Sequence, residues 1–561
     1  MVMKVVIIGG VAAGATVASR LRRLDKDIEI VILEKGHYVS YANCGLPYYI
    51  SNQIPQKDQL LLMTPQLFKD RFDIDVRVGN EVTDIISENK EVRVYDHLAQ
   101  QYYLESYDKL IIATGSSPAK LPIKGIDNHN IYQLWTFDDF EKIKQVVVSK
   151  NVKSACIIGG GFVGIETAEN LIDLQVEVDL IEKSNQILNN IDYEMIQPIQ
   201  KELVDSGIHL YLDTTLQEFD NYNDQIMVKT DKGNKIYDMV ILSVGVKPNS
   251  QLALKTGIEC NKVGGIKVDK YFQTNIRDIY AIGDVIEVED YVLHHKTMIP
   301  LAGPANKQGR MLADIIKGKE NSYNGSLGTS IIKVFHMAAA STGLNEKQLN
   351  RYGYLRHQDY QTVIIQQKSH AGYYPDAKPL FLKIIYDNEN YILGAQVVGY
   401  EGVDKRIDII ATAMKYHGKV TDLQDIHVAY APPFASAKDA INMLGYVSEN
   451  VNDGNVRFIL PDEFEQVKDD VIILDVREDD ERKQSFIEGS YHIPYGQLSQ
   501  RYQELDKNKT IVVYCAIGVR AYNCARILMQ RGFEQVFVLS GGFSFYQYYC
   551  FNEELKNVCI S

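Results

Sequence analysis

The chain has 561 residues, of which 45% are hydrophobic and 24% are charged, and its formal net charge is −14. This composition is ordinary for a globular protein, and the length predicts roughly three to four domains at ~150 residues each. The acidic excess argues against a nucleic-acid footprint. No stretch approaches the ~18 consecutive apolar residues of a membrane span.

The N-terminal sequence "MKVVIIGG" runs directly into a predicted strand, without the flank of a signal peptide. The cysteines are widely spaced and odd in number, which is not typical of a disulfide framework or a zinc site. They are Cys44, Cys156, Cys260, Cys515, Cys524, Cys550 and Cys559. We therefore expect a cytoplasmic protein without a metal site, whose thiols are either buried or reactive.

One strand–turn–helix pattern occurs twice. Residues 4–24 read "KVVIIGGVAAGATVASRLRRL", and residues 154–174 read "SACIIGGGFVGIETAENLIDL". In each copy a further apolar segment ends in an acid, at Glu34 and at Glu182. This is a dinucleotide-binding fingerprint, in which glycines permit a tight turn, the helix N-terminus binds phosphates and the acid binds ribose hydroxyls. The sequence therefore predicts two dinucleotide sites.

The two glycine-rich turns differ at one position. The second copy has Gly159, Gly161 and Gly164, whereas the first has Val11 between Gly9 and Gly14. We expect the Val11 side chain to keep the first loop further from its pyrophosphate.

A second repeat supports the duplication. "YDKLIIATGSSP" at residues 107–118 matches "YDMVILSVGVKPN" at 237–249, and both predict a strand that runs into a turn. In "TNIRDIYAIGDV" an acid, Asp284, follows a strand and Gly283. This acid is expected either to bind ribityl or phosphate-side hydroxyls or to act as a helix N-cap.

The motifs over residues 3–446 resemble those of the two-dinucleotide flavoprotein disulfide reductases. The resemblance implies an α/β protein with FAD in the first Rossmann-like domain, NADH or NADPH in a second nested one, and an α+β dimerisation domain. Glu182 favours NADH because its carboxylate repels a 2′-phosphate, whereas Lys183 leaves NADPH use open. The expected cofactor-binding residues are Gly9, Gly10, Ala13, Gly14, Glu34, Lys35, Ala113, Thr114, Gly115, Asp284, Gly159, Gly160, Gly161, Phe162, Val163, Glu166, Glu182 and Gly245.

A lone cysteine, Cys44, lies in the stretch "YVSYANCGLPYY". The single cysteine resembles the branch that contains coenzyme A disulfide reductases, NADH oxidases and NADH peroxidases. It implies a thiol that faces the flavin and reacts as a thiolate, in a positive or dipolar setting that lowers its pKa. The alternative is an inert, buried cysteine.

One residue in the first glycine turn distinguishes the enzymes of this branch from one another. Ala12 occupies the position where the oxidases and peroxidases carry a histidine, so the resemblance favours a coenzyme A disulfide reductase. It implies a homodimer in which Tyr373 and Tyr430 approach the flavin and the cysteine of the partner. Tyr374 is the alternative to Tyr373. Two residues depart from the family pattern, Asp376 where the family has glycine and Ala440 where it has proline or a similar residue.

Coenzyme A carries phosphates, so basic residues are expected along its path. By position in the family motifs, the residues that bind it are Arg20, Arg23 and Lys438 at the phosphates and Thr16, Ser40 and Asn43 at the pantetheine end.

A further α/β unit is predicted after residue 452. "DDVIILDVREDDER" predicts a buried strand, and "CAIGVR" places Cys515 at the start of a loop that leads into a helix. Backbone N–H groups in such a loop form an anion nest that stabilises a thiolate or persulfide, and Arg520 adds charge. The motif resembles the active loop of rhodaneses, which are sulfurtransferases, and Cys524 on the following helix is interpreted as a packing residue.

Taken together, the motifs of the whole chain resemble those of the fused coenzyme A disulfide reductase–rhodanese flavoproteins. The resemblance implies an FAD-dependent NAD(P)H reductase of coenzyme A disulfide, coenzyme A persulfide or polysulfide, with sulfane sulfur passing through Cys515. Two alternatives remain, an NADH oxidase or peroxidase, and a flavin-bearing redox sensor whose rhodanese domain docks a protein. The expected domains are FAD-binding at 1–117 and 248–322, NAD(P)-binding at 118–247, dimerisation at 323–446 and rhodanese at 453–561.

Overall fold

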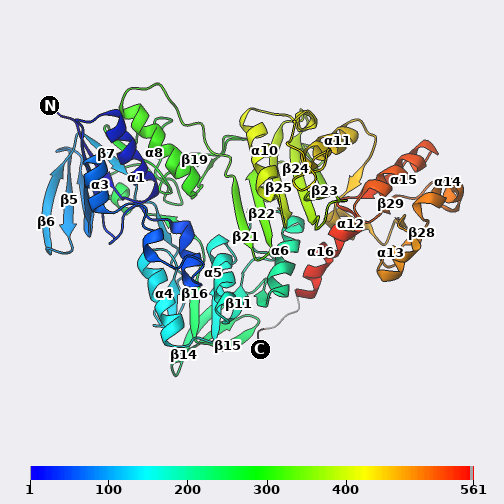
Figure 1. Cartoon of the computed structure of the whole chain (residues 1–561), viewed down its shortest axis with the longest axis horizontal. Coiled ribbons are helices and arrows are strands. Elements are labelled where there is room, and N and C mark those ends of the chain that lie inside the picture. Colours follow the sequence, from blue (N-terminus) through cyan, green and yellow to red (C-terminus); the bar gives the residue numbers. More distant parts are fainter. Residues whose placement is uncertain (1, 556–559, 561) are drawn as a thin grey trace. The chain divides into compact units, whose positions relative to one another are not determined.

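The computed structural model describes residues 2–555 and residue 560 (Figure 1). It divides into two compact units, Met1–Leu180 with Leu216–Gly328, and Ile181–Thr215 with Thr329–Ser561. Residues 556–559 and 561 lie outside the described part, and they include Cys559 and the end of the predicted rhodanese domain. Within the described residues, no helix combines the length and apolar character that crossing a membrane requires.

The first unit contains a parallel sheet formed around the N-terminal repeat. Its strand order is β18-β7-β1-β2-β3, with β18 (Ile279–Ala281), β7 (Lys109–Ile112), β1 (Lys4–Ile8), β2 (Glu29–Glu34) and β3 (Asp75–Val78). The successive residues Val5, Val6 and Ile7 are all fully buried, so both faces of the sheet are covered. The helix after the turn, α1 (Ala12–Leu24), packs against α8 (Ala302–Ile316).

The second repeat of the first unit forms another parallel sheet. Its strands follow the order β11-β10-β16-β9, with β11 (Glu177–Ile181), β10 (Ser154–Ile158), β16 (Met239–Leu242) and β9 (Ile131–Gln133). The helix after its turn is α5 (Phe162–Asp173), and α4 (Phe137–Ser149) follows β9. β8 (Ser116–Pro118) pairs with β17 (Val246–Pro248), so the two chain segments that leave the glycine turns at Gly115 and Gly245 run side by side.

The first unit also contains two three-stranded antiparallel sheets, the short antiparallel pair of β19 (Val288–Glu289) with β20 (Lys296–Thr297), and several short helices. The sheets are β4-β5-β6 (Asn80–Ile86, Glu91–Asp96, Gln101–Ser106) and β13-β14-β15 (Leu216–Tyr222, Gln225–Thr230, Gly233–Tyr237). The helices are α2 (Leu46–Ile50), α3 (Pro65–Phe72) and α7 (Gln251–Lys255).

The second unit begins with α6 (Tyr193–Asp205) and β12 (Ile208–Tyr211) and continues into an antiparallel sheet. That sheet has the order β21-β22-β25-β24-β23, with β21 (Ser330–Val334), β22 (Met337–Gly343), β25 (Ile392–Gly399), β24 (Pro379–Asp387) and β23 (Tyr360–Lys368). Its helices are α9 (Glu346–Arg351), α10 (Val403–Lys415) and α11 (Ala440–Asn452).

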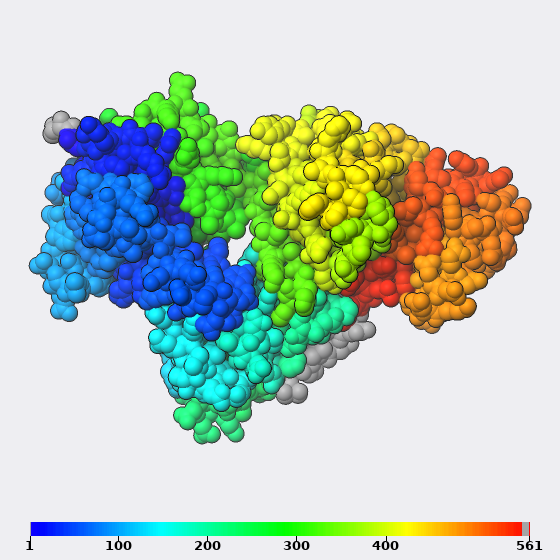
Figure 2. All heavy atoms as spheres, viewed as in Figure 1, coloured from blue at the N-terminus to red at the C-terminus, as the bar shows by residue number. Residues whose placement is uncertain are grey.

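The C-terminal residues of the second unit form a parallel sheet with helices. Its order is β26-β30-β29-β27-β28, with β26 (Phe458–Ile459), β30 (Val536–Leu539), β29 (Ile511–Tyr514), β27 (Ile472–Asp475) and β28 (Tyr491–His492). The helices are α12 (Pro461–Val467), α13 (Asp479–Gln484), α14 (Leu498–Arg501), α15 (Val519–Gln530) and α16 (Gly542–Leu555). In Figure 2 this part, coloured orange to red, forms a lobe of the second unit beside the yellow part of the chain, which Figure 1 shows to include α10.

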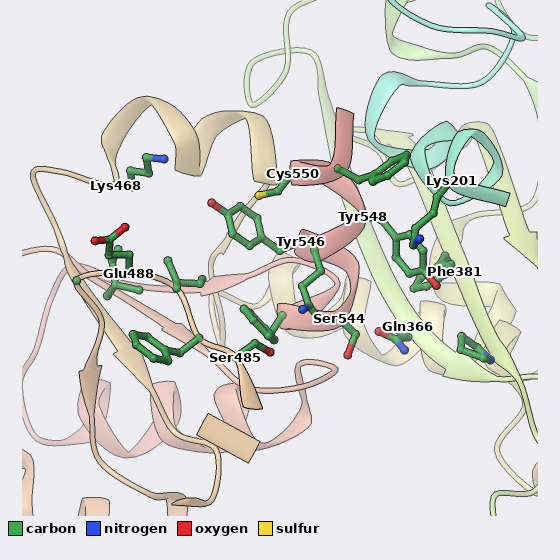
Figure 3. A pocket seen from close by; sticks show the side chains of 18 of the residues that line it. Lys201, Gln366, Phe381, Lys468, Ser485, Glu488, Ser544, Tyr546, Tyr548 and Cys550 are labelled. Carbon is green, nitrogen blue, oxygen red and sulfur yellow. The ribbon is translucent and has the colours of Figure 1, made fainter. Parts of the chain in front are cut away.

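The last helix, α16, is apolar on opposite faces. Tyr546 packs against Phe464 of α12 at 5.4 Å between ring centroids, while Phe545 packs against Phe381 of β24 at 5.2 Å. Figure 3 shows Tyr546 and Tyr548 pointing to opposite sides of this helix. The Ser540 hydroxyl also donates to the Ile364 carbonyl of β23 at 3.1 Å. Since α16 belongs to both cores, the C-terminal lobe is fixed to the antiparallel sheet.

A fully buried lysine lies at the centre of an acidic cluster in the second unit. Lys383 contacts Asp192 at 2.7 Å, Glu346 at 2.6 Å and also Glu194. Arg356 donates two hydrogen bonds to Glu346, at 2.7 and 2.8 Å. The three carboxylates have the spacing of a metal site, but the Lys383 ammonium is already their buried counterion.

Candidate active site

The first glycine turn has the geometry of a phosphate loop. Gly9 has φ +99°, and a Cβ there would lie 2.4 Å from the Ala113 carbonyl oxygen. A Cβ at Gly14 would lie 1.9 Å from the Gly9 carbonyl oxygen. The Gly10 N–H donates to Glu34 Oε2 at 2.9 Å, which holds the carboxylate at the turn. Only glycine therefore fits at these positions, and Glu34 lies where a ribose hydroxyl is expected to bind.

Asp284 is the second acid of this site. Burial raises the pKa of the Asp284 carboxyl to about 6, and Ser116 Oγ donates to it at 3.5 Å. The next helix, α8, begins only at Ala302, so the helix N-cap alternative is wrong. Two other residues predicted to bind the cofactor are Ala13 and Gly115. Ala13 packs closely against Gly283, since a Cβ built at Gly283 would lie 3.2 Å from the Ala13 Cβ, and Gly115 has φ +64°. Lys35 is exposed, and Thr114 Oγ1 donates to the Asn249 carbonyl.

The second glycine turn leaves more room. A Cβ at Gly159 would lie 2.2 Å from the Ser243 carbonyl oxygen, and one at Gly164 would lie 2.2 Å from the Gly159 carbonyl oxygen. At Gly161, the N-cap of α5, a Cβ would meet no atom within 4 Å. In the first turn Val11 is the N-cap of α1, and its side chain occupies the matching position. The space at Gly161, next to Gly160, Phe162 and Val163, fits a pyrophosphate on the N-terminus of α5.

Glu182 follows β11 and belongs to the second unit. Its Oε1 accepts a hydrogen bond from the Ser184 N–H at 2.8 Å, and its own N–H donates to the Tyr211 carbonyl. Gly245, in the turn between β16 and β17 of the first unit, has φ +89°, and a Cβ there would meet no atom within 4 Å. The residues of both turns thus fit two dinucleotides.

Cys44 lies in a short 3-10 turn, Asn43–Gly45, directly before α2. Its side chain is exposed, so the inert buried alternative does not describe it. Ser40, with φ +50°, donates its N–H to the Gly10 carbonyl at 2.9 Å. This bond ties the cysteine segment to the first glycine turn.

The side chains near Cys44 oppose its ionisation, which corrects the expected positive setting. Although Cys44 is exposed at the surface, the protein around its thiol removes part of its hydration, which raises the pKa of the thiol, and the negative charges of Glu166 and Asp284 raise it further. Burial also raises the pKa of Glu166 to about 7, and Tyr48 donates a hydrogen bond to it at 3.4 Å. Glu166 therefore faces the cysteine as well as lying on the helix of the second glycine turn.

Four of the six residues expected at coenzyme A already have side-chain contacts within their own units. Arg20 forms an ion pair with Asp314 at 2.8 Å, and the Arg23 guanidinium lies 5.0 Å from the Phe72 ring centroid. Thr16 Oγ1 donates to Asn306 Oδ1 at 2.6 Å. In the second unit the Lys438 ammonium lies 5.9 Å from the Tyr446 ring centroid.

The two predicted tyrosines lie together in the second unit. Their hydroxyls are 2.6 Å apart, and Tyr373 and Tyr430 are 76% and 47% exposed. The hydrogen bond to Tyr430 raises the pKa of the Tyr373 hydroxyl. Tyr374 instead packs edge-on against His370, with ring centroids 5.5 Å apart. The geometry thus favours Tyr373 over Tyr374 as the partner of Tyr430.

Both departures from the family pattern have a local explanation. Asp376 has φ +65°, a conformation that glycine adopts most readily. Ala440 is the first residue of α11, where proline is common.

A pocket of about 470 Å³ opens beside Tyr430. Its walls include His370, Lys405 and Phe434, and the last of these is 71% exposed. A larger pocket of about 1120 Å³ surrounds α16 and contains none of the predicted site residues (Figure 3).

Cys515 follows β29 and begins the loop that leads into α15. Its thiol is buried, and the Gly518 N–H donates to Sγ at 3.2 Å. Gly518, with φ +112°, is the N-cap of α15. Cys524 is fully buried in the core of this domain, as expected of a packing residue. Its burial, and the adjacent Cys515, raise the pKa of the Cys524 thiol to about 12.

A buried carboxylate organises the strand beside the Cys515 loop. Asp475 accepts hydrogen bonds from Arg477 at 2.7 Å, from Tyr514 at 2.8 Å and from Arg482 at 3.1 Å. Glu481 forms a bidentate pair with Arg520. Sequence reasoning missed Glu481 because its partner is distant along the chain, and the acidic run after "LDVRE" was the only signal.

Comparison with protein families identifies three segments of the chain. The model of the pyridine nucleotide-disulphide oxidoreductases matches residues 3–309, that of the dimerisation domain of these enzymes matches residues 329–441, and that of rhodanese-like domains matches residues 460–548. The chain therefore belongs to the pyridine nucleotide-disulphide oxidoreductases, which confirms the predicted α/β class with its dimerisation and rhodanese domains. Enzymes of that family use FAD and NAD(P)H, which confirms the two predicted cofactors.

Within the family, the chain is similar to coenzyme A disulfide reductases. It is 38% identical to the coenzyme A disulfide reductase of Staphylococcus aureus (strain JH9) over 446 residues, which are 79% of this chain and 99% of the relative. The crystal structure of reduced Bacillus anthracis CoADR-RHD is 42% identical, with a TM-score of 0.95 and 98% of both chains covered. An NAD-dependent persulfide reductase from A. fulgidus is 36% identical, with a TM-score of 0.91 over 97% of this chain and 100% of that one. The predicted resemblance to fused coenzyme A disulfide reductase–rhodanese proteins is confirmed.

Proposed function

We propose that this chain reduces coenzyme A disulfide, coenzyme A persulfide or polysulfide with electrons from NAD(P)H, and that Cys44 is its only redox cysteine beside the flavin. The observation that carries the proposal is the exposed thiol of Cys44 in a segment bonded to the first glycine turn. FAD, when bound, supplies the two-electron link between the nicotinamide and sulfur.

Cys44 attacks as a thiolate. Its sulfur forms a bond with one sulfur of the substrate, the substrate S–S bond breaks, and the first product leaves as a thiolate. Glu166, whose pKa of about 7 is matched to neutral pH, is proposed to hold the proton that Cys44 loses. Gly9, Gly10 and Glu34 position the FAD, and the space at Gly161 receives the nicotinamide dinucleotide.

The dimerisation domain indicates a homodimer. Tyr373 and Tyr430, whose hydroxyls share a hydrogen bond, are proposed to reach the partner's Cys44 site and donate a proton to the leaving sulfur. Thr16, Ser40, Asn43, Arg23 and Lys438 are proposed to bind coenzyme A, and Arg20 to do so only if it leaves Asp314. The domain bounds given above, and a cytoplasmic location, belong to the same proposal.

Glu182 supports a preference for NADH over NADPH. A carboxylate at this position repels a 2′-phosphate, and changing Glu182 to Ala is expected to narrow the difference between the two cofactors. Equal specificity constants in the unchanged enzyme would show that Lys183 offsets the charge.

Two substitutions test the separate roles proposed for Cys44 and Cys515. Cys515 is proposed to take sulfane sulfur as a persulfide and pass it to coenzyme A, whose long arm carries it to Cys44. Cys515→Ser should abolish sulfurtransferase activity and leave NADH-dependent reduction of coenzyme A disulfide intact. Cys44→Ser should keep sulfurtransferase turnover and flavin reduction by NADH but stop electron delivery to sulfur. Reduction of coenzyme A persulfide by Cys44→Ser at the unchanged rate would refute the role of Cys44.

The NADH oxidase alternative is tested by the rate at which oxygen reoxidises the reduced enzyme. Ala12 leaves that site without the histidine of the oxidases, so the reduced enzyme should react much faster with coenzyme A disulfide than with oxygen in stopped-flow measurements. Fast reoxidation by oxygen would favour the alternative.

A further inference from the structure

The cation of the Cys515 loop is already neutralised. Arg520 NH1 and NH2 each donate to one oxygen of Glu481 at 2.6 Å, and Glu478 lies 3.9 Å from the same guanidinium. The pKa of Arg520 is raised chiefly by its hydrogen bonds to Glu481 and further by the nearby Cys515. The guanidinium beside the thiol therefore faces two carboxylates, and the group as a whole is not positive.

The other basic residues near this loop are turned toward a buried acid. Arg477 and Arg482 both pair with Asp475, at 2.7 and 3.1 Å. The first turn of α13 adds Asp479 and Asp480, whose side chains are 72% and 92% exposed. A small anion with two charges thus approaches an acidic surface on which the guanidinium groups of Arg520, Arg477 and Arg482 are already paired with carboxylates.

The exposed side chains of the loop are apolar. Ile517 is 40% exposed and Val519 is 53% exposed, on either side of Gly518. Tyr495, which is 38% exposed, begins a short turn that packs against α15. Apolar side chains at the mouth of a reactive thiol favour contact with a carbon chain over a sulfonate group.

We propose that the Cys515 loop selects organic persulfides over small dianionic donors such as thiosulfate, and that Glu481 sets this preference by holding Arg520. The inference rests on the proposed sulfurtransferase role of Cys515 and names its donor class. Glu481 acts through Arg520 and is therefore a positioning residue, whereas the backbone N–H of Gly518 still stabilises the sulfur anion.

The transfer itself needs no oxidant or reductant. The Cys515 thiolate attacks the terminal sulfur of a persulfide R–S–SH, and a bond forms between Sγ and that sulfur. The donor S–S bond breaks, and R–S⁻ leaves with the bonding electron pair. The terminal sulfur keeps its proton, so the products are the Cys515 persulfide and a thiolate.

The test compares two donors on the full-length, FAD-loaded enzyme. The donors are thiosulfate and N-acetylcysteamine persulfide, whose only ionisable group is its sulfur, with cyanide as the acceptor and thiocyanate as the measured product. The mass of the Cys515 peptide reports whether one sulfur atom is loaded. We expect the unchanged enzyme to prefer the persulfide in kcat/KM by about tenfold or more, the scale of one charge interaction near a protein surface.

Freeing Arg520 should reverse part of this preference. Glu481→Gln should raise kcat/KM for thiosulfate by about tenfold and change the value for the persulfide by less than about twofold. The amide oxygen can still accept the Glu478 N–H that Glu481 now accepts at 3.0 Å, so α13 keeps its N-terminal capping bond. Asp480→Asn removes the same charge from α13 without touching Arg520 and is the matched control. Ile517→Lys adds a cation at an exposed site and should also raise thiosulfate use.

Three outcomes would overturn the inference, and the third would also refute the proposed sulfurtransferase function. Equal kcat/KM for both donors in the unchanged enzyme would refute the selectivity. An equal gain in Asp480→Asn and Glu481→Gln would show that general charge, and not the Arg520 pair, sets it. If neither donor loads Cys515, the proposed sulfurtransferase function fails as well.

Discussion

The thiol of Cys44 is surrounded by acids whose own pKa values are displaced. Glu166 and Asp284, with pKa values of about 7 and about 6, change charge close to neutral pH and both raise the pKa of the thiol. The reactivity of Cys44 is therefore expected to depend on pH in more than one step, because its neighbours titrate in the same range.

Replacing Glu166 by Gln should make Cys44 easier to ionise above neutral pH. The substitution removes a negative charge that exists only above the Glu166 pKa of about 7. At about pH 8, iodoacetamide should alkylate Cys44 several-fold faster in Glu166→Gln, up to about tenfold if the thiol pKa falls by one unit. At about pH 6, where Glu166 is already protonated, the rates should converge.

Asp173→Asn is the control for this measurement. It removes a charge from the same helix, at an exposed carboxylate that accepts a hydrogen bond from Gln53. Rates are read from the mass of the Cys44 peptide. A Glu166→Gln effect of equal size at both pH values would contradict the Coulombic explanation.

The N-terminus of α5 gives a prediction at the scale of an element. Gly161 has an ordinary backbone conformation, and a Cβ there meets no protein atom within 4 Å. Gly161→Val should therefore leave the melting temperature and FAD content unchanged while filling the space proposed for the pyrophosphate. The Kd for NADH, from titration of flavin reduction, should rise about tenfold or more.

Gly164→Ala provides the contrast, because its Cβ would lie 2.2 Å from the Gly159 carbonyl oxygen. This variant should lose thermal stability as well as NADH binding. Unchanged NADH affinity in Gly161→Val would place the dinucleotide elsewhere.

The buried cluster around Lys383 joins α6, α9 and β24. Lys383→Met removes the ammonium that pairs with Asp192, Glu194 and Glu346, and breaking such a buried pair costs about 3 kcal/mol or more. Arg356 still pairs with Glu346, and Lys347 still attracts Asp192 and Glu194. The carboxyl pKa values in the folded state then rise above those of the unfolded chain. Stability of this variant should accordingly fall as the pH rises and recover as the pH falls.

The measurement is the melting temperature from about pH 5.5 to about pH 8. Lys378→Met, at an exposed position of the same domain, is the control and should show the pH dependence of the unchanged protein. A loss of stability in Lys383→Met that does not depend on pH would mean that packing, and not charge, dominates the site.

At the scale of the whole molecule, the rhodanese domain is part of the scaffold of the second unit. Arg356 contacts Asp462 at 3.0 Å and Glu463 at 3.1 Å, and Phe381 packs against Phe545 and Tyr548 of α16. The relative from Staphylococcus aureus is covered to 99% by 446 aligned residues, so it has no room for such a domain.

A chain that ends at Asn455 lacks α16 and should therefore expose the apolar face of β24 that contains Phe381. Relatives without the rhodanese domain have no such helix to cover this face. Phe381 is fully buried in the complete chain, and without α16 it is expected to promote association. Light scattering should show aggregates for the truncated chain and a uniform species when Phe381→Lys is added. A uniform truncated chain without that substitution would show that the domain is only tethered.

The sequence by itself determined the features that depend on residues close together in the chain. Both glycine turns, the acids at Glu34 and Glu182 and the loop from Cys515 to Arg520 are contiguous patterns, because strand, turn and helix each require particular residues at short spacing. The tertiary structure decided the pairs that lie far apart, since only packing brings them together. It placed Glu481 on Arg520, Glu166 and Asp284 beside Cys44, and three carboxylates around Lys383. The sign of the electrostatic environment at both cysteines therefore came from the fold, because a charge acts through distance in space and not through position along the chain.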